Sequence, residues 1–118
     1  MIAGVIAAIT FFIHLILGQS TLINPMMESD LGTLVKTEFL AVWHMISVIL
    51  LATAVLYIVY SIKNIPSSVM ICLLSNLYLV FGVVFILAGI YNNVFILQWI
   101  LLLPIGILGL VGIKKHSI

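Results

Sequence analysis

The chain has 118 residues, of which 65% are hydrophobic and only 6% are charged, and its mean hydropathy is +1.46. A soluble domain carries about a quarter of its residues as Asp, Glu, Lys and Arg, so this composition excludes a water-facing globular protein and predicts an integral membrane protein. A net charge of +1, with no arginine, excludes a nucleic-acid-binding surface. The single cysteine, Cys72, excludes an intrachain disulfide.

The positions of the charged residues predict the membrane spans. They leave three long uncharged stretches, residues 1–27, 39–62 and 64–113. The last stretch would be roughly 75 Å long as one helix, whereas the hydrocarbon core of a bilayer is about 30 Å thick, so it must contain two spans. We place the break at Tyr91-Asn92-Asn93, where an interfacial ring and two turn-forming amides interrupt the apolar run.

Each span is predicted to be a helix, because the hydrocarbon offers no water to pair with backbone groups. We therefore expect an all-α integral membrane protein, a four-transmembrane-helix antiparallel bundle that forms one membrane domain over residues 1–118. Asn64 and Pro66 suit the beginning of the third span, since proline is accepted in a first helical turn. The expected spans are about 2–18, 39–61, 66–90 and 95–113.

The lysines predict the orientation of these spans. Lys63, Lys114 and Lys115 fall on the side of both termini, whereas Lys36 lies on the opposite side together with the acidic residues. Lysine on short loops marks the cytoplasmic side of a membrane. Both termini are therefore expected in the cytoplasm, and residues 19–38 outside it.

The outer segment, residues 19–38, is the only sizeable polar stretch of the sequence. A turn at Asn24-Pro25 followed by a short amphipathic helix over about 29–37 is expected there. The segment is either a lid over the outer half of the bundle or a plain interfacial connector.

Three polar side chains inside the spans need a partner or a role, namely His14, His44 and Gln98. Counted from the span boundaries at about 1.5 Å per residue, they lie within about one helical turn of the same depth, in the outer half of the membrane. Ser47 and Gln19 are expected to join this polar layer. The layer is the candidate functional site of the sequence.

Stripes of residues spaced three or four apart indicate which faces of the helices meet, since small side chains let helices approach closely. These stripes place both histidines toward the interior of the bundle. Trp43 and Trp99 are expected to anchor the outer interface instead. The stripes are Gly4, Ala8, Phe11, His14 and Gly18 on the first span, Ala41, His44, Ser47, Leu51 and Ala54 on the second, and Ser75, Tyr78, Gly82 and Gly89 on the third.

The pattern His14-Leu15-Ile16-Leu17-Gly18-Gln19, together with Trp43-His44 and the late Trp99, resembles an uncharacterised group of small four-span bacterial membrane proteins. That group carries His-x-x-x-Gly-Glu near the end of the first helix and Trp-His early in the second. Gln19 stands where the group has Glu, so no role that requires a carboxylate is carried over. The resemblance implies a protein of the bacterial cytoplasmic (inner) membrane and brings no function with it.

Several functions remain open. The polar layer suits an accessory or structural membrane protein, in which interhelical hydrogen bonds fix the helix register, or a protein that binds a ligand at this layer. Its partners would be the lipid bilayer and either a second copy of the chain or the other subunits of a larger membrane complex. As an alternative, His14 and His44 could hold haem as axial ligands, or copper near Met26, Met27 and Met45.

A small transporter subunit is a further alternative, because ionisable residues inside a membrane often mark a transport path. Against it, none of the expected spans contains a charged residue. An enzyme is the least favoured class, since the sequence shows no pairing of acids or of a nucleophile with a base.

Overall fold

The computed structural model describes residues 1–65 and 69–116, with side chains up to residue 113. This part of the chain is helical apart from short connections and contains no strand, as expected for an all-α protein. Its elements in chain order are α1 (Ile2–Ile13), the π-helix η1 (His14–Ile23), α2 (Asn24–Glu28), α3 (Thr33–Ile62), α4 (Val69–Asn92) and α5 (Gln98–His116).

Three of these helical segments are long and apolar enough to cross a membrane. They are Ile2–Glu28, which comprises α1, η1 and α2 in one run, Thr33–Ile62 and Val69–Asn92. At about 1.5 Å per residue they are roughly 40, 45 and 36 Å long, against a hydrocarbon core of about 30 Å. Gln98–Ile113 is a shorter apolar helix. The chain is therefore a small helical membrane protein.

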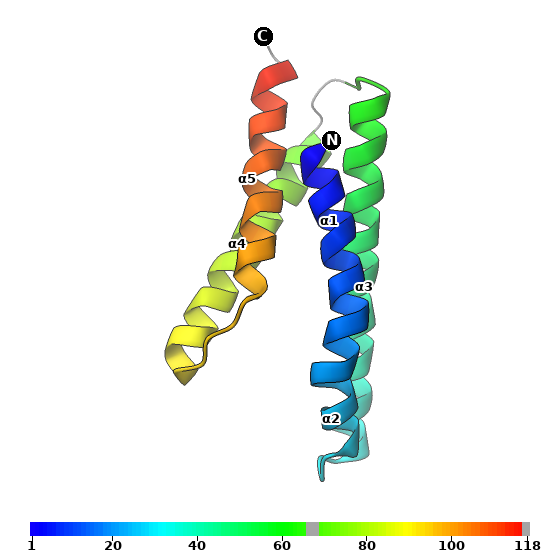
Figure 1. The fold of residues 1–118 in the computed structure, drawn as a ribbon, viewed down its shortest axis with the longest axis vertical. Coiled ribbons are helices and arrows are strands. Elements are labelled where there is room, and N and C mark those ends of the chain that lie inside the picture. Colours follow the sequence, from blue (N-terminus) through cyan, green and yellow to red (C-terminus); the bar gives the residue numbers. More distant parts are fainter. Residues whose placement is uncertain (66–68, 117–118) are drawn as a thin grey trace.

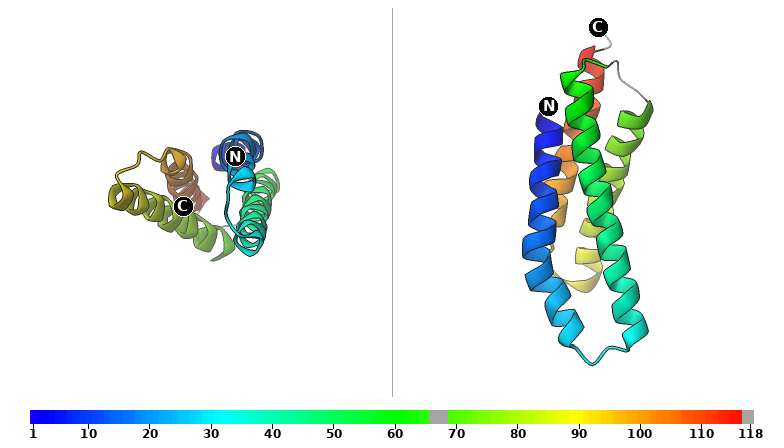
Figure 2. Two further views of the ribbon diagram at one scale, coloured as in Figure 1. Left: turned by 90° about the horizontal axis from the view of Figure 1, so that it is seen from below. Right: turned by 90° about the vertical axis from the view of Figure 1, so that its right-hand side faces the viewer.

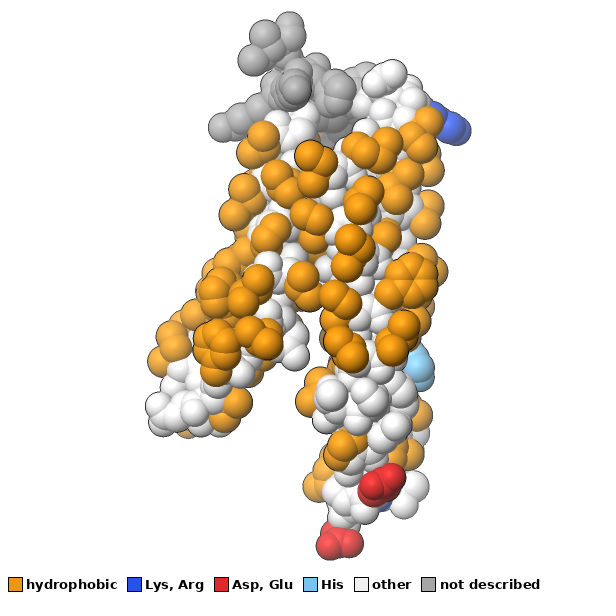
Figure 3. Space-filling view, in the orientation of Figure 1, with side chains coloured by type: hydrophobic (Ala, Val, Ile, Leu, Met, Phe, Trp, Pro, Cys, Tyr) orange, Lys and Arg blue, Asp and Glu red, His pale blue; other side chains and the backbone are white. Residues whose placement is uncertain are grey.

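The helices pack as two hairpins. The N-terminal hairpin pairs the run from α1 to α2 with α3, the C-terminal hairpin pairs α4 with α5, and α1 also packs against α5 (Figures 1 and 2). The hairpins meet at the end that holds the N-terminus and diverge toward the other end, so that the molecule has the outline of an inverted V in Figure 3. We call these the closed end and the open end.

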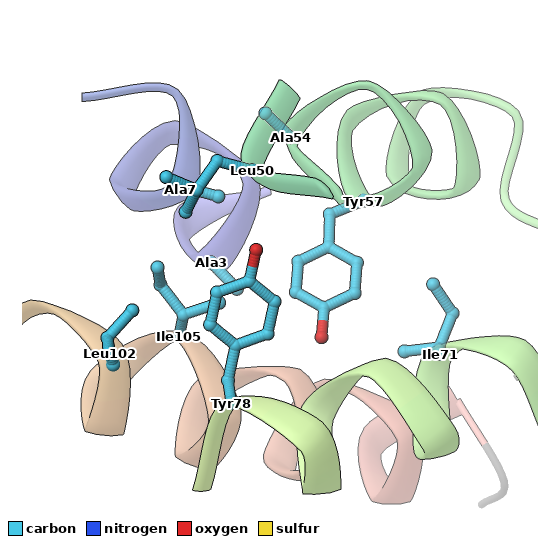
Figure 4. Close-up of a cluster of buried hydrophobic side chains, with 9 residues drawn as sticks. All are labelled: Ala3, Ala7, Leu50, Ala54, Tyr57, Ile71, Tyr78, Leu102 and Ile105. Carbon is cyan, nitrogen blue, oxygen red and sulfur yellow. The ribbon is translucent and has the colours of Figure 1, made fainter. Parts of the chain in front are cut away.

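The core lies where the hairpins meet. At its centre the Tyr57 hydroxyl lies 2.8 Å from the Ser75 hydroxyl, which itself donates a hydrogen bond to the Ile71 carbonyl. Tyr57 is therefore the donor in the contact between the hairpins. Both side chains are buried. Tyr57 belongs to a cluster of buried hydrophobic side chains, which Figure 4 draws. Its members are Ala3, Ala7, Leu50, Ala54, Tyr57, Ile71, Tyr78, Leu102 and Ile105.

Glycines let the helices approach at the closed end. A Cβ on Gly4 would come within 2.8 Å of Ile58, which shows how closely α1 lies on α3. A Cβ on Gly109 would overlap the Ser75 hydroxyl and lie 2.7 Å from the Tyr57 hydroxyl. Gly109 therefore brings α5 directly against the polar contact that joins the hairpins.

The outer segment differs from its prediction. Residues 24 and 25 form no turn, because the helical run continues through them to Glu28, although Pro25 lacks the N–H that would donate within the helix. The break falls at residues 29–32, where Ser29 has an extended backbone and its hydroxyl donates to the Met26 carbonyl at 2.6 Å. No separate amphipathic helix or lid forms over 29–37, since α3 begins at Thr33.

The break near residue 92 is confirmed. α4 ends at Asn92, and Asn93 takes the left-handed conformation with φ 52°, which closes the helix by a hydrogen bond from Val94 N–H to the Gly89 carbonyl. Asn64 has φ 49° and ends α3 in the same way, so it does not begin the third span as predicted. Pro66, also expected in that first turn, lies outside the described residues.

Candidate functional site

A cavity of about 470 Å³ lies between the two hairpins and extends toward the open end. Both hairpins contribute to its wall, and most of the wall is aliphatic or aromatic. Its aromatic residues are Phe39, Trp43, Tyr78, Phe81 and Phe85, and its polar residues include Thr10, His14, Thr21 and Gln98. The cavity thus has an apolar wall with a few polar groups, which is the usual composition of a small-molecule site.

The three residues of the predicted polar layer lie on different helices, which diverge toward the open end (Figure 1). The close contacts among Gly4, Tyr57, Ser75 and Gly109 define a reference point at the closed end. Counted from it along each helix at about 1.5 Å per residue, His14, Gln98 and His44 lie about 15, 16 and 20 Å toward the open end. That they form one layer stays a prediction.

His14 stacks on Trp43. The two ring centroids are 3.8 Å apart and the rings are 17° from parallel. His14 Nε2 lies 3.3 Å from the Trp43 carbonyl, which also accepts a hydrogen bond of 3.0 Å from the buried Ser47 hydroxyl. Because a carbonyl only accepts, Nε2 carries the proton, and in the neutral ring Nδ1 is left as an acceptor. Ser47 and His14 therefore share one acceptor, the backbone carbonyl of Trp43.

The π-helix η1 begins at His14, so the candidate site coincides with unusual backbone geometry. In this stretch the hydrogen bonds reach five residues back, as from the Asn24 N–H to the Gln19 carbonyl. The hydroxyls of Ser20 and Thr21 donate to the same Leu17 carbonyl at 2.9 and 2.7 Å. Such competing donors loosen the ordinary ladder of an α-helix. π-Helical turns are rare and occur frequently at functional sites.

Gly18 brings η1 against Trp43. A Cβ at this position would overlap the six-membered ring of the indole. Trp43 is accordingly buried within the protein, only 7% exposed, and does not anchor an outer interface as predicted. Its indole ring is instead part of the cavity wall, held between η1 and α3.

The other predicted site residues lie in different surroundings. Gln98 is the first residue of α5 and lines the cavity. Gln19 lies outside the cavity wall and donates from its side-chain amide to the Asn24 side chain at 3.1 Å. Trp99 is partly buried and does not line the cavity.

His44 is exposed and does not line the cavity, so the expectation that both histidines face the interior holds only for His14. The reason is the helical rotation of about 100° per residue: Trp43 faces η1, so its neighbour His44 faces away. Within the described residues, no group of three or more His, Cys, Asp or Glu side chains could hold a metal ion. One chain therefore does not present both imidazoles to a single haem or copper ion in this cavity.

Two buried polar atoms near the cavity lack a hydrogen bond among the described residues, Trp43 Nε1 and the Tyr78 hydroxyl. The Tyr78 hydroxyl lies near Thr53, whose own hydroxyl donates to the Ile49 carbonyl at 2.8 Å. Sequence reasoning did not assign either aromatic residue to the site. The signal for Tyr78 was its place in the predicted stripe of the third span, all of which is buried.

Comparison of the chain with family models, with curated proteins and with solved structures gave no match.

Proposed function

We propose that this protein is a four-span antiparallel bundle of the bacterial cytoplasmic membrane that binds a small lipophilic ligand in the cavity between its hairpins. The observation that carries the proposal is the cavity itself, about 470 Å³ in volume and walled by both hairpins. Ligand sites for small molecules have volumes of about 300 to 1,000 Å³, with mostly apolar walls and a few polar groups.

The membrane arrangement rests on the helix lengths and the charges. Three helical segments are long enough to span, and Gln98–Ile113 is the shorter fourth. The acidic residues Glu28, Asp30 and Glu38 lie in or beside the turn at the open end of the N-terminal hairpin, whereas Lys63 follows α3 at the closed end. The lysine side favours cytoplasmic termini, with the open end outside.

The chemistry of the cavity wall favours an apolar occupant of modest size. Five aromatic rings face it, and aromatic side chains provide large contact areas for rings or chains. The hydroxyls of Thr10 and Thr21 donate to carbonyls of their own helical run, so His14 and Gln98 remain to orient one end of a ligand. A continuous polar path, which a transporter subunit would need, is not part of this wall.

The haem or copper alternative is tested in the same preparation. Absorption spectroscopy and metal analysis of the purified protein would show a Soret band or stoichiometric copper if this alternative holds. Of the two histidines, His14 lines the cavity and His44 does not. A site with two histidine ligands would therefore be supported only if His14→Ala and His44→Ala each removed the signal.

Fluorescence quenching tests ligand binding directly. Trp99→Phe leaves Trp43, which lines the cavity, as the only tryptophan. In nanodiscs of saturated phosphatidylcholine, brominated long-chain alcohols, ethers and alkanes are titrated against its emission. Binding at the cavity gives saturable quenching, whereas simple partition into the bilayer gives quenching that rises in proportion to the added probe.

A matched pair of variants places the binding site. Val42 and Val48 both lie on α3 and are 54% and 66% exposed, but only Val42 lines the cavity. Val42→Phe fills part of the cavity and is expected to weaken saturable quenching about tenfold, since the added ring and the ligand compete for the same space. Val48→Phe leaves it unchanged. Quenching that never saturates with any probe contradicts the proposal and favours an accessory or structural protein.

A further inference from the structure

Two polar groups of the cavity wall have no partner within the described part of the protein. His14 uses Nε2 toward the Trp43 carbonyl, and no described group hydrogen-bonds its Nδ1. The side-chain amide of Gln98 likewise has no hydrogen bond to a described residue. His14 is partly buried and Gln98 is exposed, so both groups are accessible to a ligand in the cavity, which could hydrogen-bond to each.

The two groups can hydrogen-bond to one ligand group that both donates and accepts. Nδ1 of a neutral His14 whose Nε2 carries the proton is purely an acceptor, so it needs a donor. The Gln98 amide carries both a donor and an acceptor, and its nitrogen can donate to a ligand oxygen. One hydroxyl group supplies both, because its hydrogen donates while its oxygen accepts. A ketone or an ether supplies only the acceptor.

The cavity wall also excludes charge. Among the described residues that line it, none is Asp, Glu, Lys or Arg. A carboxylate or phosphate placed there would lack a counter-charge, and burying an unpaired ion in an apolar medium is strongly unfavourable. The lining therefore selects against fatty-acid anions and phospholipid headgroups.

We propose that the ligand of this cavity is an uncharged lipid alcohol, whose hydroxyl donates to His14 Nδ1 and accepts a hydrogen bond from the Gln98 amide. This inference rests on the proposed function and specifies its ligand class. His14 belongs to the N-terminal hairpin and Gln98 to the C-terminal one. A bound hydroxyl would thus connect the hairpins at the open end, as the contact between Tyr57 and Ser75 connects them at the closed end.

A headgroup series tests the ligand class in the Trp99→Phe protein. A brominated long-chain alcohol is the reporter, and non-brominated competitors of the same chain length displace it: the alcohol, its methyl ether, the alkane and the carboxylate. The alcohol is expected to bind about fivefold tighter than the ether, since the ether lacks the donor for His14. The carboxylate is expected to bind at least about tenfold more weakly than the alcohol.

Two variants test whether His14 and Gln98 cause the preference for the alcohol over the ether. Gln98→Leu and His14→Phe keep side chains of similar size and remove one hydrogen-bonding group each. In both, the ratio of alcohol to ether affinity is expected to fall, toward one in His14→Phe. The controls are Gln19→Leu and His44→Phe, which change the same residue types outside the cavity and should keep the ratio of the parent protein. A ratio within one protein is insensitive to small changes in overall stability.

The outcomes separate the two proposals. If ether, alkane and alcohol compete equally while quenching still saturates, the lipid-alcohol inference is overturned and ligand binding stands. The same holds if the carboxylate binds best. If no member of the series displaces a saturable signal, ligand binding itself fails, and the inference fails with it.

Discussion

The two ends of the molecule differ in how their polar side chains are hydrogen-bonded. At the closed end the Tyr57 hydroxyl donates to Ser75, Ser75 donates to the Ile71 carbonyl, and Gly109 lies directly against both hydroxyls. At the open end His14 and Gln98 belong to different hairpins, and His14 Nδ1 and the Gln98 amide have no hydrogen bond to a described residue beside a cavity of about 470 Å³. The hydroxyls that join the hairpins at the closed end are thus paired with each other, whereas these two groups of the open end are available to a ligand.

The difference shows what each end contributes. Interhelical hydrogen bonds in membranes contribute about 0.6 kcal/mol on average, so close packing through small residues provides most of the stability of the closed end. The open end has few such contacts between the hairpins and instead contains the π-helix η1, whose start at His14 marks the site. Substitutions at the closed end should therefore change stability, and those at the open end should change binding.

The largest effect is expected from Gly109→Leu. Its side chain would overlap the Ser75 hydroxyl and force α5 away from the junction of the hairpins, which should cost about 3 kcal/mol of unfolding free energy. Gly112→Leu, three residues farther along α5, is the control, because a Cβ there meets no described atom within 4 Å. Unfolding by SDS in mixed micelles measures both. Equal losses in the two variants would show that the closed end does not depend on this contact.

A smaller effect is expected from Gly18→Ala at the open end. The added Cβ overlaps the indole of Trp43, but a side chain can move where a backbone cannot, so the expected loss is about 1 to 2 kcal/mol. The displaced ring should become more accessible to the bilayer, which brominated phospholipids detect as stronger quenching in the Trp99→Phe background. Gly32→Ala is the control, since a Cβ at Gly32 meets nothing within 4 Å. Unchanged quenching in Gly18→Ala would contradict the role of Gly18 in seating Trp43.

Much of the fold follows from the sequence because charge is so sparse. The helical class and the break near Asn92 both depend on where apolar runs end. The number of apolar residues that a helix needs to cross the hydrocarbon core sets such boundaries. The boundary at Asn24-Pro25 was misplaced because a proline inside a helical run removes a hydrogen bond without always ending the helix, so its presence did not prove a turn.

The faces of the helices were harder to predict, and α3 and α4 show why. On α4 small and polar residues share one buried face, Ser75, Tyr78, Gly82 and Gly89, as predicted. On α3 the predicted stripe through His44 is exposed at His44 and Leu51, and the buried face runs through Trp43, Ser47, Leu50, Ala54 and Tyr57. An apolar residue suits lipid and core equally, so hydrophobicity does not distinguish the two faces of a spanning helix. Contact with η1 is what places Trp43, and not His44, inside the protein.

The smallest effect is expected from the polar contact of the closed end itself. Tyr57→Phe keeps the buried ring and removes only the hydrogen bond to Ser75. The Ser75 hydroxyl still donates to the Ile71 carbonyl, so no donor is orphaned, and the expected loss is about 0.6 kcal/mol in the SDS titration. Tyr91→Phe, at a side chain that is 87% exposed, is the matched control and should be neutral. A loss from Tyr57→Phe as large as that from Gly109→Leu would mean that hydrogen bonding, and not close packing, holds the hairpins together. The closed end would then not be the end that is stabilised by packing.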